Sequence, residues 1–140
     1  MSRIFWDTNL FIYFLEGNDE LSAATRRLRK SMLSRGDQLL TSALTLGEIL
    51  VKPLERGDTA RCREIEAAIS RAALLLPFEG NAAWRYAAIR RDRSLRAPDA
   101  VQLACAATAN VDLFVTNDRR LQGKRVDGIQ FIVALDQVPI

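Results

Sequence analysis

Five short apolar runs, separated mostly by longer segments with helical periodicity, constrain the fold of this chain more than any other feature. The runs cover residues 4–6, 39–41, 74–76, 113–116 and 131–133. They are apolar on successive residues rather than on alternate ones, which is typical of strands that are buried on both faces. Helical patterns between such strands indicate parallel pairing, because parallel neighbours need a crossover connection. The pattern therefore predicts an α/β protein, a three-layer α/β/α sandwich with a central parallel sheet of about five strands.

Helices are expected between these runs, because apolar positions recur there at helical spacing. The expected helices cover residues 11–15, 21–35, 45–56, 59–72, 84–91 and 99–109. Pro53 should interrupt the third of them. Trp84 shares a helical face with Ala87 and Ala88, which predicts that it packs in the core. Stacking of Trp84 and Tyr86 on a base is the alternative.

Length and composition favour a single globular domain over residues 1–140. Hydrophobic residues make up 49% and charged residues 26% of the chain, as in ordinary folded proteins. No apolar stretch approaches the roughly 18 residues that a membrane span requires. The N-terminal segment MSRIFWDTN lacks the pattern of a secretory signal, so we expect a cytoplasmic protein with no membrane partner.

The absence of histidine excludes several kinds of catalysis. The chain contains 0 His and only 2 Cys, Cys62 and Cys105, which are not arranged as a pair of metal ligands. Nucleophilic schemes that depend on a histidine base are thereby excluded. If the protein is an enzyme, carboxylates must carry most of the chemistry. The net charge of +3 permits a polyanionic partner without establishing one.

Four acidic residues stand out by their position relative to the expected strands. Asp7 directly follows the first strand, and Glu48 comes soon after the second. Asp99 opens the helix that leads into the fourth strand, and Asp118 lies just past that strand. Ligands of open parallel sheets bind beyond the carboxyl ends of the strands. The sequence therefore predicts that these four carboxylates converge there.

Each of the four acids also has an ordinary structural explanation. Asp7 is a favoured helix N-cap residue, and Glu48 ends a Thr-x-x-Glu sequence that resembles a capping box. Asp99, next to Pro98, suits the first turn of a helix, and Asp118 could cap a turn. Capping does not require the acids to meet at one edge of the sheet, whereas a cation site does.

Converging carboxylates raise one another's pKa unless a cation lies among them. Oxygen-only ligation favours one or two Mg²⁺ or Mn²⁺ ions. Such ions activate water and neutralise charge on a phosphodiester. The predicted reaction is attack of water on phosphorus with departure of a 3′-hydroxyl, which leaves a 5′-phosphate. Neighbouring residues that could orient the acids are Thr8, Asn9, Thr116 and Asn117.

The segments FWDTN, TSALTLGE, RAPDAVQLACA and FVTND occur in this order along nearly the whole chain. The ordered set resembles the PIN-domain ribonucleases, particularly the toxins of VapBC-type toxin–antitoxin pairs. The resemblance implies that the catalytic and metal-binding acids are Asp7, Glu48, Asp99 and Asp118, and that Thr116 matches the Thr or Ser of the last motif. It also implies an endoribonuclease that acts on RNA such as tRNA or rRNA, forms a homodimer, and is inhibited by a small antitoxin docking near residues 42–72.

Arginines flank two of the four acids. Arg96 precedes Asp99, and Arg119 and Arg120 follow Asp118, which predicts contacts with RNA phosphates. Solvated arginines paired with neighbouring acids are the alternative, and for the basic run 26–30 it is the favoured interpretation.

Two other functions remain open at this point. One is a PIN-type nuclease that acts on DNA or in RNA processing and is not a toxin. The other is a non-catalytic α/β binding module whose acids serve only as caps, which predicts no metal binding. Comparison of RNA and DNA substrates distinguishes the first from an RNA-cleaving toxin, and metal binding distinguishes the second.

Overall fold

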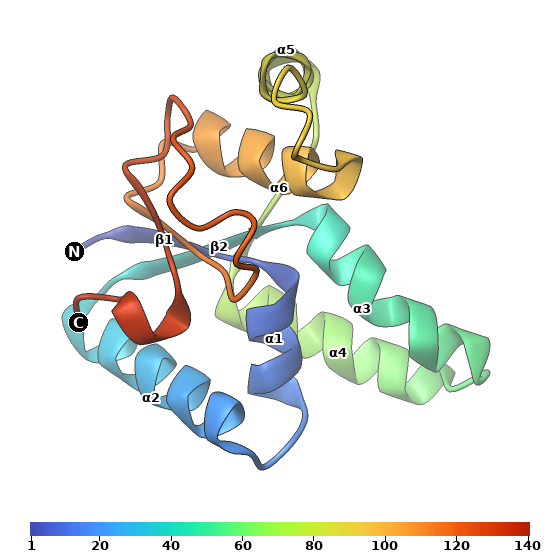
Figure 1. The fold of residues 1–140 in the computed structure, drawn as a ribbon. Coiled ribbons are helices and arrows are strands. Elements are labelled where there is room, and N and C mark those ends of the chain that lie inside the picture. The colour runs from blue at the N-terminus through green and yellow to red at the C-terminus, as the bar shows by residue number, and fades with distance from the viewer.

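The computed structural model describes residues Met1 to Ile140. Figure 1 shows a central sheet with helices on both sides. The elements in chain order are β1 (Arg3–Trp6), α1 (Thr8–Leu15), α2 (Glu20–Arg35), β2 (Gln38–Ser42), α3 (Ala43–Glu55), α4 (Thr59–Ala72), β3 (Leu74–Leu76), α5 (Gly80–Ile89), α6 (Ala97–Thr108), β4 (Leu113–Val115), β5 (Phe131–Val133) and the short 3₁₀ helix η1 (Leu135–Gln137).

The five strands form one sheet in the order β3-β2-β1-β4-β5, and all pairs are parallel. Phe5, in the central strand β1, lies opposite Leu40 of β2 on one side and Phe114 of β4 on the other. The predicted parallel sheet and the α/β/α sandwich are confirmed. All five predicted strands are present, with ends that differ from the prediction by at most one residue.

Two apolar cores flank the sheet. The first lies against α5 and α6, where the rings of Phe5 and Phe114 stack with centroids 4.9 Å apart. Several alanines of α6, Ala104 and Ala107 among them, are fully buried, so this helix packs closely on the sheet. The second core lies against α1, α2 and α4 and contains the buried residues Trp6 and Met32. Figure 1 shows α5 and α6 above the sheet and α1, α2 and α4 below it.

The prediction that Trp84 packs in the core is wrong. Its side chain lies on the outer side of α5 and is 82% exposed. The helix begins at Gly80 and packs Ala82, Tyr86 and Ile89 against the first core. These three positions follow the helical repeat, and Trp84, two residues beyond Ala82, faces away from them.

Two local predictions about α3 are also wrong. Pro53 does not interrupt the helix, because it lies in the last turn and α3 continues to Glu55. The capping-box explanation of Glu48 fails as well, since the N-cap residue is Ser42 and Glu48 lies in the second turn. None of the helices combines the length and apolarity that crossing a bilayer requires.

Candidate active site

The candidate site lies where β1 and β4 end. From β1 the sheet grows outward through β2 to β3, and from β4 it grows in the opposite direction to β5. These two neighbouring strands therefore flank the point where the strand order reverses, the usual ligand position in open α/β sheets. The Asp7 amide donates to the Val115 carbonyl at 3.0 Å, which extends the pairing to the first motif acid.

Asp7 is held by hydrogen bonds on both carboxylate oxygens. Its Oδ1 accepts from the Thr8 amide at 2.8 Å, which caps α1. Its Oδ2 accepts from the Thr116 hydroxyl at 2.7 Å. The predicted capping role is confirmed, and it leaves the second oxygen directed toward the end of β4.

Glu48 reaches the site from α3 and is exposed. Its Oε1 accepts a 2.7 Å hydrogen bond from the Thr8 hydroxyl. The Thr8 oxygen itself accepts from Nε2 of Gln102 at 3.0 Å. A chain of hydrogen bonds from α6 through α1 thus orients the Glu48 carboxylate.

Asp99 and Asp118 share one cation, the guanidinium of Arg120. Nη1 of Arg120 lies 3.3 Å from Oδ2 of Asp99, and Nε donates to Oδ1 of Asp118 at 3.2 Å. Nη2 of Arg120 pairs with the other Asp118 oxygen. Asp99 also accepts from the Arg96 amide at 3.1 Å, the capping role expected at the start of α6. The Asp118 amide donates to the Thr116 hydroxyl at 3.0 Å, so Thr116 links Asp118 to Asp7.

The pKa values of these acids are shifted in opposite directions. Burial raises the pKa of Asp7 above its ordinary value, and the negative charges of Glu48 and Asp99 raise it further, against the hydrogen bonds from Thr116 and Thr8. Burial also acts to raise the pKa of Asp118, but the hydrogen bonds from Arg120 outweigh it and lower that pKa. The local field therefore disfavours a negative charge on Asp7 and favours one on Asp118.

Three of the four predicted acids, Asp7, Glu48 and Asp99, line one cavity of ≈ 220 Å³. The structure does not place Asp118 in its lining. It connects Asp118 to the cavity through Thr116 and Arg120. As the side chains stand, no three acidic or cysteine residues are close enough to hold one ion.

The donor set fits a hard divalent cation. All the candidate ligands are carboxylate oxygens, which Mg²⁺ and Mn²⁺ prefer. Burial and the neighbouring carboxylates disfavour the negative charge of Asp7, and a cation bound nearby stabilises that charge. Arg120 already neutralises part of the charge on the other side of the site.

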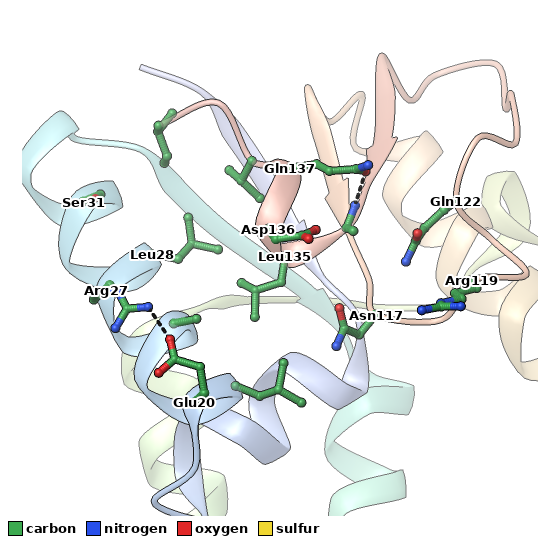
Figure 2. A pocket seen from close by; sticks show the side chains of 15 residues that line it. Glu20, Arg27, Leu28, Ser31, Asn117, Arg119, Gln122, Leu135, Asp136 and Gln137 are labelled. Atoms are coloured by element: carbon green, nitrogen blue, oxygen red, sulfur yellow. Dashed lines mark hydrogen bonds and ion pairs between the residues drawn. The ribbon is translucent and has the colours of Figure 1, made fainter.

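A larger cavity lies elsewhere in the molecule. It measures ≈ 810 Å³ and is bounded by α2, η1 and the segment after β4. In Figure 2, Arg27 and Glu20 form an ion pair on one side of this cavity, and Asn117 and Arg119 lie on the opposite side. None of the four acids lines it. This larger cavity therefore begins beside the motif at the end of β4 without containing the four acids.

The other predicted site residues fall into two groups. Thr8 and Thr116 contact carboxylates of the site directly. Asn9 accepts from the Asn117 amide at 3.4 Å, and the Asn117 side chain donates to the Tyr13 hydroxyl at 3.4 Å, so this pair braces the loop.

Of the three predicted RNA-contacting arginines, two lie on the carboxylates themselves. Arg120 joins Asp99 and Asp118, and Arg96 lies 3.8 Å from Asp99. Arg119 has no ion-pair partner and is exposed. It is therefore the one of the three whose guanidinium is free.

The sequence interpretation missed Gln102. This residue is 2% exposed and lines the same cavity as Asp7, Glu48 and Asp99. Its Nε2 donates hydrogen bonds to the hydroxyl oxygens of Thr8 and Thr45. Its Oε1 accepts a hydrogen bond from the Ser42 hydroxyl. It lies three positions after Asp99, on the same face of α6. A lone amide in the small apolar segment AVQLACA was the available signal, since a buried glutamine needs polar partners.

Fold and site together define an α/β protein with a carboxylate-lined cavity at the switch point of a parallel sheet. A family model described as PIN domain matches residues 4–127. The chain belongs to the PIN-domain family. Proteins of this family are generally nucleases, and they generally use divalent metal ions.

Several solved structures are similar to the chain along nearly its full length. The DNA-bound VapBC from Salmonella typhimurium is 20% identical with a TM-score of 0.73, over 96% of this chain and 99% of that chain. VapBC2 from Rickettsia felis, bound to a promoter DNA fragment, is 12% identical with a TM-score of 0.74, over 94% and 98%. VapBC-5 from Mycobacterium tuberculosis is 19% identical with a TM-score of 0.62, over 94% and 98%. At these identities the likeness concerns the fold. Among curated proteins none matches.

Proposed function

We propose that this protein is a metal-dependent endoribonuclease that hydrolyses RNA phosphodiesters and is the toxin of a toxin–antitoxin pair. One observation carries the nuclease part. Carboxylates from three separate segments, Asp7, Glu48 and Asp99, line one cavity at the switch point of a PIN fold. Asp118 is linked to the same cavity through Thr116.

In this proposal Asp7, Asp99, Asp118 and Glu48 hold one or two Mg²⁺ or Mn²⁺ ions. A bound ion supplies an activated water and neutralises charge on the phosphodiester. Neighbouring residues orient the acids. Thr116 and the Thr8 amide orient Asp7, and the Thr8 hydroxyl orients Glu48.

Water attacks phosphorus in line and the 3′-oxygen leaves, so the products carry a 5′-phosphate and a 3′-hydroxyl. Arg119 is exposed and unpaired, and it suits a contact with a flanking phosphate. Arg96 and Arg120 are candidate phosphate contacts once they are released from the acids. RNA such as tRNA or rRNA is the proposed substrate in the cytoplasm.

The toxin assignment is supported by the fold shared with the VapBC structures. A docking region for an antitoxin is proposed at residues 42–72, which form α3 and α4. A groove of ≈ 470 Å³ runs along α3 next to Glu48 and carries the exposed apolar residues Ile12 and Val51. A homodimer is part of the same proposal.

The test of the proposed activity is cleavage of a structured RNA and of a DNA of matched sequence, with EDTA, Mg²⁺ or Mn²⁺. We expect metal-dependent cleavage of RNA that is lost in Asp7→Asn and Asp99→Asn, while both variants remain folded by circular dichroism. Preference for DNA, or full activity of both variants, contradicts the proposal. Growth arrest on expression of the wild type, absent with Asp99→Asn, tests the toxin assignment.

A further inference from the structure

Arg120 occupies the position of a cation between two of the metal-binding candidates. Its side chain is 40% exposed, while those of Asp99 and Asp118 are only 13% and 24% exposed. One guanidinium therefore pairs with two carboxylates that are largely withdrawn from water. We propose that Arg120 is an internal counter-ion that a divalent metal ion must displace, and that it thereby sets the metal affinity of the site. This inference rests on the proposed metal-dependent function.

The contacts of Arg120 place a positive charge against both carboxylate oxygens of Asp118. Nε and Nη2 take both of its carboxylate oxygens, and the Arg120 amide adds a 3.0 Å hydrogen bond to Oδ1. Nη1 takes Oδ2 of Asp99, which also accepts from the Arg96 amide. A guanidinium fork matched to carboxylates in this way is among the stronger polar contacts in proteins. The positive charge of the guanidinium beside these oxygens opposes the approach of a second cation.

The same contacts explain why the four acids do not close around one point. Asp7 and Glu48 are bound by Thr116 and Thr8 and make no contact with Arg120. Asp118 is instead drawn to the guanidinium and lies outside the lining of the acid cavity. Closing the ligand set requires that Arg120 release Asp99 and Asp118.

The balance of charge in the site favours replacement of the Arg120 guanidinium by a divalent metal ion. Arg120 and Arg96 together supply two positive charges to a site with four carboxylates. Asp7 and Glu48 have no positively charged partner, and this excess of negative charge attracts an ion of charge +2. Exchange also frees the three N–H groups that hold the acids, and these suit a substrate phosphate. Arg120 thus links metal binding to the availability of a phosphate contact.

Isothermal titration of the full chain with MnCl₂ tests the inference. The variants are the wild type, Arg120→Gln, Arg120→Lys and Arg125→Gln, the last a matched control because Arg125 is exposed and contacts none of the acids. Removal of a competitor that dominates the metal-free state tightens the apparent Kd by the reciprocal of the fraction of time the site was unblocked. We expect about tenfold tighter Mn²⁺ binding for Arg120→Gln, for a blocked state populated roughly 90% of the time. Arg120→Lys should fall in between, because an ammonium lacks the fork that holds both acids.

Thermal melts in EDTA and in excess Mn²⁺ provide a second readout. Arg120→Gln should melt lower than the wild type in EDTA, since two carboxylates lose their partner, and it should gain more from Mn²⁺. Equal or weaker Mn²⁺ binding by Arg120→Gln, with binding by the wild type intact, overturns the role of Arg120 and leaves the proposed nuclease standing. Absence of Mn²⁺ binding in every variant overturns both. An equal decrease of the Mn²⁺ Kd in Arg125→Gln overturns the specific role of Arg120, because the effect would then come from the net charge of the protein.

Discussion

The Thr116 hydroxyl lies 2.7 Å from Oδ2 of Asp7 and donates to it, although the two residues are 109 positions apart in the chain. The hydroxyl oxygen of Thr116 also accepts a hydrogen bond from the Asp118 amide. One buried hydroxyl therefore connects the first and the last of the four motif acids. Its hydrogen bond lowers the pKa of Asp7, against the burial and the negative charges that raise it.

Substitution Thr116→Val removes this hydroxyl with little change of shape. At neutral pH we expect a loss of about 1.5–3 kcal/mol in the free energy of unfolding, because a charged acceptor is left without its donor. The loss should shrink as pH falls and Asp7 becomes protonated. Urea denaturation at pH 7.5 and pH 4.5 measures both. Thr25→Val is the control, since the buried Thr25 hydroxyl donates to a neutral carbonyl, that of Leu21. A loss at Thr116 that does not depend on pH contradicts the account.

Substitution Asp7→Asn should stabilise the metal-free protein at neutral pH. The folded-state pKa of Asp7 is raised above 3.8, so its ionisation costs stability as pH rises through the folded-state pKa. Asparagine removes that charge and keeps the capping oxygen. We expect a gain on the order of 1 kcal/mol in EDTA, together with loss of RNA cleavage.

Asp19→Asn is the matched control for this prediction. Asp19 is also an N-cap residue, but its pKa is lowered, chiefly by the hydrogen bonds from Ser22. Its neutralisation should give no gain at neutral pH. Equal stabilisation by both substitutions, seen in thermal melts, speaks against burial and charge repulsion at Asp7 as the cause.

Gln102→Ala tests the buried amide that the sequence interpretation missed. Ser42 and Thr45 lose a partner in the interior, and Thr8 loses the donor that orients it toward Glu48. We expect a destabilisation of about 1–3 kcal/mol and reduced cleavage at temperatures where the variant is folded. The exposed Gln130→Ala should change neither quantity. Unchanged cleavage by folded Gln102→Ala would show that Thr8 does not need this support.

Arg119→Gln tests the free guanidinium beside the site. In an Asp99→Asn background, RNA binding should weaken for all sequences alike, and the slope of log K against log salt should fall by about 1. Fluorescence anisotropy at several KCl concentrations measures both quantities. Arg71→Gln removes an exposed charge from α4 and should leave the slope unchanged. An unchanged slope in Arg119→Gln means that Arg119 contacts no phosphate.

The two tryptophans should respond in opposite ways to truncation. Trp6 is fully buried and Trp84 is 82% exposed. Trp6→Ala should cost about 3–5 kcal/mol, whereas Trp84→Ala should stay within about 0.5 kcal/mol. Acrylamide should quench the fluorescence of Trp84 and spare that of Trp6. A large loss of stability in Trp84→Ala would place that side chain in an interface or in the core.

Local sequence patterns were sufficient to determine the architecture. Runs such as 4–6 and 113–116 are apolar on every or nearly every residue, and only strands covered on both faces remove such runs from water. Helical patterns between most of the runs then require parallel pairing. The position of Asp7 directly after a strand follows from the same local signals, because side-chain periodicity is a property of neighbouring residues.

Tertiary packing decided how the acids are arranged. Nothing local distinguishes Asp118, which pairs with Arg120, from Asp7, which lines the cavity, because the difference depends on where α6 brings Asp99 relative to the end of β4. The exposure of Trp84 was decided in the same way, by which side of α5 meets the sheet. Hydrophobic periodicity selects elements and their buried faces, but contacts between residues far apart in the chain depend on distances that only the packed elements fix.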